Sequence, residues 1–509
     1  MVAQHVLPFQ YREDTKSNGA TALAGLPLYL DLAAAAGLRE SVERNVQSRG
    51  ASRQGWTDSQ MVLSTVLLNL AGGDVVDDFD VLEADEGFGR VLRRVEWHGL
   101  SRRERRKLGR RWRKERERSV PSSSAAFRFL ESFHDEQEEK RRFEGKAFIP
   151  KAKKALRGLT RVNADLVAFA QRIAPQPVAT LDMDATLVES HKKTARFCYK
   201  GFRAYQPLNT WWAEQGLVVH SEFRDGNVPA GFEQKRVFEE ALKCMPESVE
   251  KVYLRSDTAG YQIDLLQYCA EGKNERFGEI EFAIGADVSP EFKKAVSQVR
   301  AEDWKPLRRK LKGEWRDTDQ EWAEVVFVPN WIRSKNGPTY RYLAIREPLR
   351  QLDLPTLETQ EELPFPTMEF TDIGRFKLFG VVTNRDLPGE ELIAWLRERC
   401  GKSEEAHAVM KDDLAGGRMP SWKFGANAAW WQMMLLSLNL NAIMKRHALG
   451  SSWAERRMKA VRFGIIRIAG WVVLHARRLE IRIGYGHPAV RWIKRTRERI
   501  AEFAARAPT

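Results

Sequence analysis

The segment "TLDMDATLVESH", residues 180–191, places two aspartates one residue apart after an apolar run. The pattern predicts a strand, and side chains two residues apart on a strand point to the same face, so Asp182 and Asp184 would lie together. Carboxylates at a strand end suit two kinds of phosphoryl chemistry. They hold divalent metal ions in nucleases, and in haloacid-dehalogenase-type phosphatases such a pair supplies a nucleophile and an acid. This stretch alone leaves both alternatives open.

Two more carboxylates occupy positions that suit a metal site. Asp257 follows the apolar run "VYL", where a predicted strand meets its loop, and Glu404 lies in a predicted helix. His407 and Lys411 share the helix face of Glu404, because residues three, four and seven positions apart are neighbours on a helix. Two-metal phosphoryl chemistry needs about three or four carboxylates around two Mg²⁺ ions about 3.5–4 Å apart. Asp184, Asp257 and Glu404 are therefore the candidate catalytic and metal-binding set.

Each of these carboxylates also has a more ordinary interpretation. An Asp at a strand end commonly caps a turn, and a Glu on a polar helix commonly faces solvent. Glu405 is an adjacent alternative to Glu404. The sequence leaves three roles open for Asp182: a further metal ligand, an acid that supports the ligands, or a buried hydrogen-bonded carboxylate.

The charge balance predicts a polyanionic partner. The 509 residues include 83 Lys and Arg against 69 Asp and Glu, which gives a net charge of +14. Such an excess favours nucleic acid first and an anionic membrane second.

A basic segment at residues 101–118 holds eleven Lys or Arg and three Glu, together with Trp112. A solvated helix is the ordinary interpretation of such a run, and contact with DNA phosphates is the functional one. The candidate DNA-binding residues in this segment are Arg102, Arg103, Arg105, Arg106, Arg110, Arg111 and Arg113.

Residues 1–150 predict an all-helical DNA-binding region. A helix is expected from Thr57 and Asp58, which are N-terminal caps, to Gly72, and two short amphipathic helices follow it. Pro121 and a serine cluster mark the start of another helix. Short helices joined by tight turns suit a helix-turn-helix-like module.

From about residue 176 the pattern becomes α/β. Strands are predicted for "PVATLDMDATLV", "ARFCYKGFRAY" and "LVVHSEFRDGN", then a helix, the strand "EKVYLRSDTAGY", a short helix and the strand "FAIGAD". This element order is that of a ribonuclease-H-like core, whose two parts are predicted at residues 151–299 and 379–450.

A β-rich insertion is predicted at residues 300–378, where strand-like pieces alternate with polar, Pro-rich loops. Its last strand is expected to return to the core. Phe424 to Met444 carries no charge but holds several Asn and Gln residues, which predicts a buried helix of a large soluble core and not a membrane span. Residues 451–509 predict a basic helical tail.

The four cysteines are far apart and form no C-x-x-C pair. A reducing cytosol is therefore expected, without a disulfide framework or a zinc ribbon. The first residues, "MVAQHVLPFQYREDTKS", lack the charged-then-apolar pattern of a signal peptide.

Several of these segments occur together in one known family. "LDMDATL", "HKK", "YKGFRAYQPLNTWW", "EFRDGNVPAG", "VYLRSDTAGYQ", "RCGKSEEAHAVMKDDLAGG" and "FGANAAWW" follow one another along the chain. In this order they resemble the DDE transposases of bacterial insertion sequences, specifically the insertion-sequence 1380 family. "LLNLAGGDVVDDFDVLEAD" and "PSSSAAFRFL" look like that family's leading region, so the resemblance runs from about residue 20 to about residue 445.

The resemblance implies a ribonuclease-H-like catalytic core that is interrupted by a β-rich insertion before its final acidic helix. It assigns the three acids to Asp184, Asp257 and Glu404, the last because Lys411 follows seven residues later, as in the family's helix motif. It also implies that Lys411 contacts DNA phosphate near the cut.

One position departs from the family pattern. The family has an Arg four residues before the Glu, and this chain has Cys400 there. Arg399 or Arg397 is the expected substitute. Between the first two acids, Lys200, Arg203 and Arg224 are candidate DNA-facing positions, and they are equally ordinary surface charges.

The activity implied by the resemblance is DNA transposition. Two Mg²⁺ ions, for which Mn²⁺ may substitute, would activate water against the phosphodiester at the element's end and stabilise the leaving 3′-oxygen. The freed 3′-OH would then attack target DNA. The expected partners are double-stranded terminal inverted repeats and target DNA, bound by a dimer in the bacterial cytoplasm at the nucleoid, with no membrane and no small-molecule cofactor.

Three other interpretations stay open at this level. A domesticated transposase would bind DNA without cutting it, and a site-specific nuclease would use the same acids without strand transfer. A phosphatase would use Asp182 as nucleophile and Asp184 as acid, but it needs a late acidic pair after a strand, and "KDD" at 411–413 lies in a helical pattern instead. Trp211 and Trp212 are either core residues or a platform for an extruded base.

Overall fold

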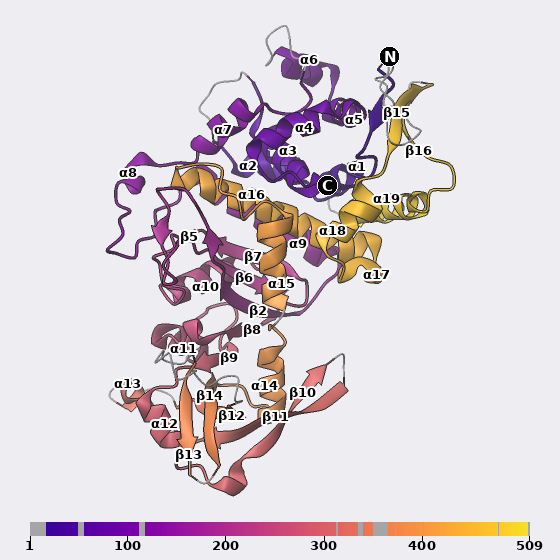
Figure 1. The fold of residues 1–509 in the computed structure, drawn as a ribbon. Helices are drawn as coiled ribbons and strands as arrows, with labels where there is room; N and C mark the ends of the chain where they lie inside the picture. Colours follow the sequence, from indigo (N-terminus) through magenta and orange to yellow (C-terminus); the bar gives the residue numbers. More distant parts are fainter. Residues whose placement is uncertain are drawn as a thin grey trace, which may run out of the picture.

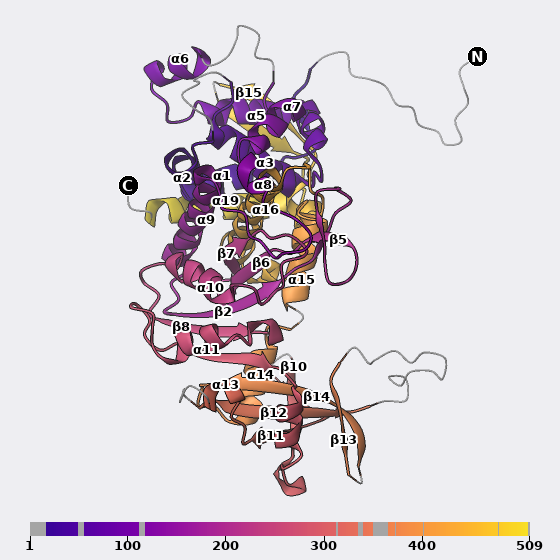
Figure 2. The same ribbon diagram turned by 90° about the vertical axis from the view of Figure 1, so that its left-hand side faces the viewer.

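The computed structural model describes residues 17–48, 55–110, 118–311, 314–333, 339–349, 365–371, 373–400, 402–476 and 478–506. The fold is mixed α/β. Helices make up one half of the molecule, a large mixed sheet runs from its centre into the other half, and the two halves are stacked end to end (Figures 1 and 2). The most buried apolar side chains of the helical half and of the central strands belong to one continuous cluster, so they share a core.

Five central strands position the candidate site. They lie in the order β7-β6-β2-β8-β9, with β8 parallel to β2, β9 parallel to β8, and β6 and β7 antiparallel to their neighbours. Helix α10 (Gln234–Lys243) leads from β7 to β8, and α11 (Ile263–Ala270) leads from β8 to β9. The strands are β2 (Val178–Ala185), β6 (Leu208–Trp212), β7 (Leu217–Glu222), β8 (Lys251–Ser256) and β9 (Glu281–Ala286).

The predicted order of strands and helices is present, but the second predicted strand is in the wrong place. "ARFCYKGFRAY" is not a strand of the central sheet. It folds back at Gly201, which has a φ of +81°. The two arms, β4 (Arg196–Phe197) and β5 (Arg203–Tyr205), form a small separate sheet with β3 (Val188–Glu189). The central strand is the next one, β6, where "LNTWW" pairs with β2.

The predicted β-rich insertion extends the same sheet. Its strands continue from β9 in the order β14-β12-β11-β10, and β13 pairs with β14. The last strand returns to the core as predicted, because Gly380 of β14 lies opposite Ala286 of β9 in an antiparallel pair. The strands are β10 (Lys305–Leu311), β11 (Glu314–Val325), β12 (Arg341–Pro348), β13 (Thr367–Phe370) and β14 (Gly374–Thr383).

Helix α14 (Gly389–Arg397) follows β14 and packs on β9, β10 and β11. Its Leu392 and Ile393 are buried against Leu307 and Trp322. The smaller helices around this end of the sheet are η2 (Thr258–Gly260), α12 (Pro290–Val296), η3 (Ala301–Asp303) and α13 (Asn330–Arg333).

The uncharged segment forms α16 (Phe424–Ile443), and the prediction of a buried helix is confirmed, since all its residues except Ala442 are buried. It packs on α3 (Asp58–Ala71), α7 (Ser123–Glu131), α9 (Lys154–Ile173) and β7. Its polar side chains are hydrogen-bonded, as burial requires. Asn439 donates to Oδ1 of Asn163 at 2.7 Å, for example.

No single described helix is long and apolar enough to cross a membrane. One pair of helices, Asp58–Ala71 with Val76–Ala84, meets the criteria of length and composition together, but the two are bent by 94°.

The N-terminal helices begin and end where local signals predict. Thr57 accepts a hydrogen bond from the Gln60 amide in a capping box at the start of α3, and Gly72, with a φ of +97°, ends the helix. The other helices of this region are α1 (Pro27–Ala35), α2 (Leu38–Asn45), η1 (Val76–Asp78), α4 (Phe79–Ala84), α5 (Glu86–Glu96), α6 (Arg102–Arg110) and α8 (Glu136–Glu139).

The C-terminal tail is not wholly helical, which corrects the prediction. Within the predicted tail, "RLEIRI" forms strand β16 (Arg478–Ile483), which pairs with β15 (Gly470–His475), and β15 pairs with β1 (Ala20–Thr21) near the other end of the chain (Figure 1). That long-range pairing has no local signal. The remaining elements are α15 (Lys402–Ala408), η5 (Val409–Asp413), η6 (Met444–Leu449), α17 (Ser451–Ala454), α18 (Met458–Val461), η7 (Arg462–Ile466) and α19 (Ala489–Arg506).

Candidate active site

The ends of β2 and β8 bring the first two candidate acids together. The strands are parallel neighbours, and Met183 lies opposite Ser256. Asp184 is therefore the next residue on β2, and Asp257 is the residue directly after β8. Because parallel strands end at the same edge of a sheet, two apolar runs that each finish in an Asp deliver both carboxylates to one place.

The Asp184 carboxyl has a pKa well above that of an ordinary Asp. Burial raises its pKa, the Arg399 guanidinium lowers it, and Asp257 and Glu404 raise it further, so that the pKa is about 6. Asp257 and Glu404 therefore both act on Asp184 through space. Burial, which disfavours the charged form, is the largest cause of the raised pKa, and the two acids add to it.

The alternatives Glu404 and Glu405 face different partners. Glu404 acts on Asp184 and on His407. Glu405 acts on Lys445, which lies on η6. The structure thus places Glu404, and not its neighbour, on the side of the first two acids.

Arg399 lies where the missing family arginine would act. Its Nη2 is 3.3 Å from Oδ2 of Asp184, and the residue is buried. Arg397 instead donates to Oε1 of Gln320 at 2.7 Å. Cys400, at the position of the family's arginine, is exposed. Of the two predicted substitutes, Arg399 is the one that reaches the acids.

Asp182 is a buried, fully paired carboxylate. Its Oδ1 accepts from Nε of Arg255 at 2.6 Å and its Oδ2 accepts from Nη2 of the same residue at 2.9 Å. Arg255 also donates to the carbonyl oxygen of Trp395 and to Glu398 at the end of α14. Of the three roles open to Asp182, the hydrogen-bonded carboxylate matches the structure. The phosphatase alternative required a free nucleophile here, and the pairing argues against it.

Asp257 also performs the ordinary function of a strand-end Asp. Its Oδ1 accepts from the Ala259 amide at 3.1 Å and caps the short helix η2. This bond fixes the side chain at the end of β8 and keeps it beside Asp184.

Two residues of the acidic helix complete the site. Lys411 donates through Nζ to the carbonyl oxygen of Leu187, just beyond β2, at 3.4 Å. Burial and the nearby Lys411 lower the pKa of His407 to about 4, so its imidazole is neutral at neutral pH. The sequence placed His407 on the correct helix face but assigned it no role.

Among the described residues, no group of three or more His, Cys, Asp and Glu side chains lies close enough to share one metal ion. Arg399 takes up one oxygen of Asp184 in the present arrangement. The donor types nonetheless suit a divalent cation, because carboxylate oxygens are the ligands that hard cations prefer.

The predicted DNA-binding arginines of the basic segment are partly described. Arg102, Arg103, Arg105 and Arg106 are exposed on α6. The side chain of Arg110, and Arg111 and Arg113 as a whole, lie outside the described residues. The DNA contacts of all seven stay predictions.

The other basic and aromatic candidates differ in exposure. Arg224 is fully buried and pairs with Glu222 at 2.8 Å, so its prediction as a DNA-facing residue is wrong. Arg203 is half-buried and donates to the Ala195 carbonyl oxygen at 2.6 Å. Trp212 is fully buried, which matches the core interpretation of the tryptophan pair.

Comparison with known proteins agrees with this geometry. The family model described as "Transposase DDE domain group 1" matches residues 12–344 and 359–505. The chain belongs to the DDE transposase family.

The chemistry of DDE transposases is DNA cleavage and transfer. Among solved structures, this DDE transposase is similar to a piggyBac transposase, from a cryo-EM structure of its synaptic complex with hairpin DNA, at 10% identity and a TM-score of 0.40. The match covers 88% of this chain and 81% of that one. No curated protein matches the chain.

Proposed function

We propose that this DDE transposase is of the insertion-sequence 1380 type, binds the terminal inverted repeats of its element, and cuts and joins DNA through Asp184, Asp257 and Glu404. The observation that carries the assignment is the placement of Asp184 and Asp257 at the ends of the neighbouring parallel strands β2 and β8. Glu404, on helix α15, and Asp257 both act on the Asp184 carboxyl through space and raise its pKa.

The order of the central strands supports a ribonuclease-H-like core as part of this proposal. Three antiparallel strands are followed by two parallel ones, with a helix before each of the last two. The insertion leaves the core after β9 and returns by β14, before the acidic helix. The proposed division is a DNA-binding helical region at 1–150, a core in two parts at 151–299 and 379–450, and a tail from 451.

The reaction class is hydrolysis of the phosphodiester at the element's end, which frees a 3′-OH, followed by attack of that 3′-OH on target DNA. Arg399 fixes the orientation of Asp184, and the Asp182–Arg255 pair holds the end of α14 against β2 and β8. Lys411 places a positive charge beside the end of β2, where it can contact a DNA phosphate.

Two Mg²⁺ ions are part of the proposal, with Asp184, Asp257 and Glu404 as the residues that would hold them. Bound there, they would supply a lower pKa for the attacking water and charge neutralisation for the leaving oxygen. Pairing of two element ends by a dimer on DNA also belongs to the proposal.

The test is cleavage of DNA duplexes that end in the element's inverted repeats, by purified protein with Mg²⁺ or Mn²⁺. We expect nicks or double-strand cuts at the repeat ends and joined products with target DNA. Asp257→Asn should lose both, while Asp264→Asn, an exposed Asp on the nearby α11, should keep them. Cutting by Asp257→Asn at the wild-type rate would overturn the assignment of the acids.

A further inference from the structure

A cavity of about 560 Å³ opens directly beside the first two acids. Asp184 and Asp257 line one part of it, and Phe197 and Tyr199, from the hairpin between β4 and β5, line another. This volume lies in the range of pockets that hold small organic ligands or single nucleotides. Only part of such a space is needed for a phosphodiester at the acids, so the remainder has no assigned occupant.

The hairpin that borders the cavity has the composition of a nucleic-acid contact. Residues 191–205 contain five Lys or Arg, four aromatic residues and no acid. Tyr199 is 78% exposed and Phe197 is 47% exposed, which is unusual for large rings. The guanidinium of Arg203 lies over the Phe197 ring at 4.3 Å, so the ring is supported from one side. Aromatic rings interleaved with positive charge are the common platform for unpaired bases.

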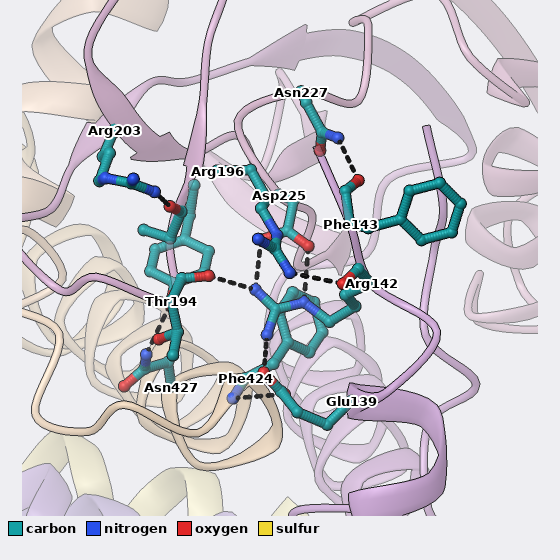
Figure 3. Close-up of polar contacts among 12 residues, drawn as sticks. Glu139, Arg142, Phe143, Thr194, Arg196, Arg203, Asp225, Asn227, Phe424 and Asn427 are labelled. Atoms are coloured by element: carbon teal, nitrogen blue, oxygen red, sulfur yellow. Dashed lines mark hydrogen bonds and ion pairs between the residues drawn. The ribbon is translucent and has the colours of Figure 1, made fainter. Parts of the chain in front are cut away.

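The base of this hairpin is held rigidly by a buried ion pair (Figure 3). Arg142 donates through Nε and Nη2 to the two carboxylate oxygens of Asp225, at 2.7 and 2.6 Å. Its Nη2 also donates to the carbonyl oxygen of Thr194, at the start of the hairpin, at 3.0 Å. Arg196 in turn donates to the carbonyl oxygen of Arg142. The exposed Phe197 and Tyr199 rings therefore belong to a hairpin whose base is held by hydrogen bonds.

The lining of the cavity also includes polar groups. Asn227 lines it, and its amide donates to the carbonyl oxygen of Phe143 at 3.2 Å, which fixes its position (Figure 3). Gln206 lines it as well and is only 5% exposed. Its Oε1 has no hydrogen-bond donor among the described residues. That oxygen has almost no accessible surface, so it does not face the cavity.

We propose that this cavity takes an unpaired nucleobase of the DNA end, stacked on Tyr199 and Phe197. The inference rests on the proposed function, since the backbone of that nucleotide would lie at Asp184 and Asp257. A small anion fits the cavity less well than a base. The two carboxylates that line the cavity would repel it, and it would make no use of the Tyr199 and Phe197 rings. Extrusion of a base from a duplex costs a few kcal/mol, and a stacking platform offsets that cost.

Binding of two DNA probes in a metal chelator tests the inference without any cleavage. The probes are a short fully paired duplex and the same duplex with one unpaired adenine near its end, and fluorescence anisotropy gives both affinities. The probes differ only in the unpaired base, so electrostatic contributions nearly cancel. Stacking on an aromatic ring is worth about 1–3 kcal/mol, so we expect the wild type to prefer the unpaired probe by roughly 5- to 150-fold.

Variants of exposed tyrosines assign the preference to the hairpin. Tyr199→Ala should abolish it and Tyr199→Phe should retain it, and both should fold because the side chain is largely exposed. Tyr485→Ala, which removes a fully exposed tyrosine between β16 and α19, should retain it as the matched control. Equal wild-type affinity for the two probes, or a preference that survives in Tyr199→Ala, overturns the inference.

The outcome is separable from that of the proposed function. A protein that shows the Tyr199-dependent preference but never cuts element ends in Mg²⁺ contradicts the transposition chemistry and supports the base site. A protein that cuts the ends but binds both probes equally contradicts the base site alone.

Discussion

Asp182 and Arg255 form a two-point ion pair in the interior of the sheet, with both carboxylate oxygens bonded to the guanidinium at 2.6 and 2.9 Å. Asp184, two residues further along the same strand, lies 3.3 Å from the Arg399 guanidinium. Two carboxylates on one face of a strand therefore differ chemically. The first is paired through both oxygens, whereas burial, together with two further acids, raises the pKa of the second to about 6.

Replacing Asp184 by Asn should stabilise the fold above pH 6. The folded-state pKa of about 6 lies above the ordinary Asp pKa of 3.8, so ionisation of this group destabilises the folded state as pH rises through that interval. The stability gained by Asp184→Asn should be absent near pH 3.8 and on the order of 2 kcal/mol above pH 7. Urea unfolding in a metal chelator at a series of pH values measures it. An Asp184→Asn protein less stable than wild type at pH 7 would contradict the raised pKa of Asp184.

Asp182→Asn is the matched comparison, since it makes the same chemical change on the same strand face. It should destabilise the fold by about 3 kcal/mol, because removing one partner of a buried ion pair leaves the Arg255 charge uncompensated. The same urea unfolding measures it. A neutral effect of Asp182→Asn would mean that the pair does not hold Arg255 as the structure shows.

The pair of His220 and Glu240 should make stability depend on pH outside the active site. Burial lowers the His220 pKa, but contacts with Cys244 and Glu240 outweigh it and raise the pKa to about 9. Burial raises the Glu240 pKa, but His220 and Arg236 outweigh it and lower the pKa to about 2. The stabilisation is therefore complete between pH 4.5 and pH 6.5, the ordinary pKa values of Glu and His, and is lost towards pH 9 and towards pH 2.

His220→Gln should test this dependence. Its destabilisation relative to wild type should be largest near pH 5.5, at about 1–3 kcal/mol, and should shrink as the pH rises to 9. Thermal unfolding across this range measures it. His98→Gln, at an exposed histidine after α5, is the control and should show no such trend. A constant difference for His220→Gln from pH 5.5 to pH 9 would show that the imidazole carries no charge in the folded protein.

Local patterns predicted the first two acids because both signals are short-range. An apolar run that ends in an Asp predicts both the strand and the position of its last carboxylate. Parallel pairing of β2 and β8 then brings the two carboxylates to the same edge of the sheet. The family resemblance added Glu404, which a one-residue ambiguity on an exposed helix turn would otherwise have left undecided.

The partners of those acids were harder to predict, because they depend on contacts between distant segments. Arg255 follows the apolar run "VYL" in β8. A charge buried in such a strand requires a counter-charge, so the sequence did indicate that Arg255 has an acidic partner. No local signal marks the pairing of Arg399 with Asp184 or of Arg142 with Asp225. The single strand predicted for residues 195–205 is two short strands, because the chain turns back at Gly201 and β4 pairs with β5.

The buried pair of Arg142 and Asp225 should control the order of the hairpin that borders the cavity. Arg142→Met removes the bonds to Asp225 and to the Thr194 carbonyl oxygen, and it leaves the Asp225 carboxylate buried without its partner. We expect a loss of about 3 kcal/mol in stability and faster tryptic cleavage after Lys193 and Lys200, which are both exposed. Mass spectrometry of limited digests locates the cuts.

A suitable control for that experiment breaks an exposed ion pair elsewhere. Arg300→Met removes the contact of Arg300 with Asp303 at 2.9 Å, and it should change neither stability nor the digest by a measurable amount. Unchanged cleavage after Lys193 and Lys200 in a destabilised Arg142→Met protein would mean that the hairpin is ordered by its own strands and not by the ion pair.

The basic helix α6 should add affinity for any DNA and make binding sensitive to salt. Arg102 and Arg103 are exposed at its start, at the end of the molecule farthest from the insertion (Figure 1). Each neutralised phosphate contact lowers the slope of log affinity against log salt by about 0.9, so the double change to Gln should reduce that slope by about 2. Filter binding of a generic duplex at several salt concentrations measures it. The matched double change of Lys293 and Lys294 to Gln on α12 should leave the slope unchanged. An unchanged slope for the α6 double variant would identify this helix as a solvated one that does not contact DNA.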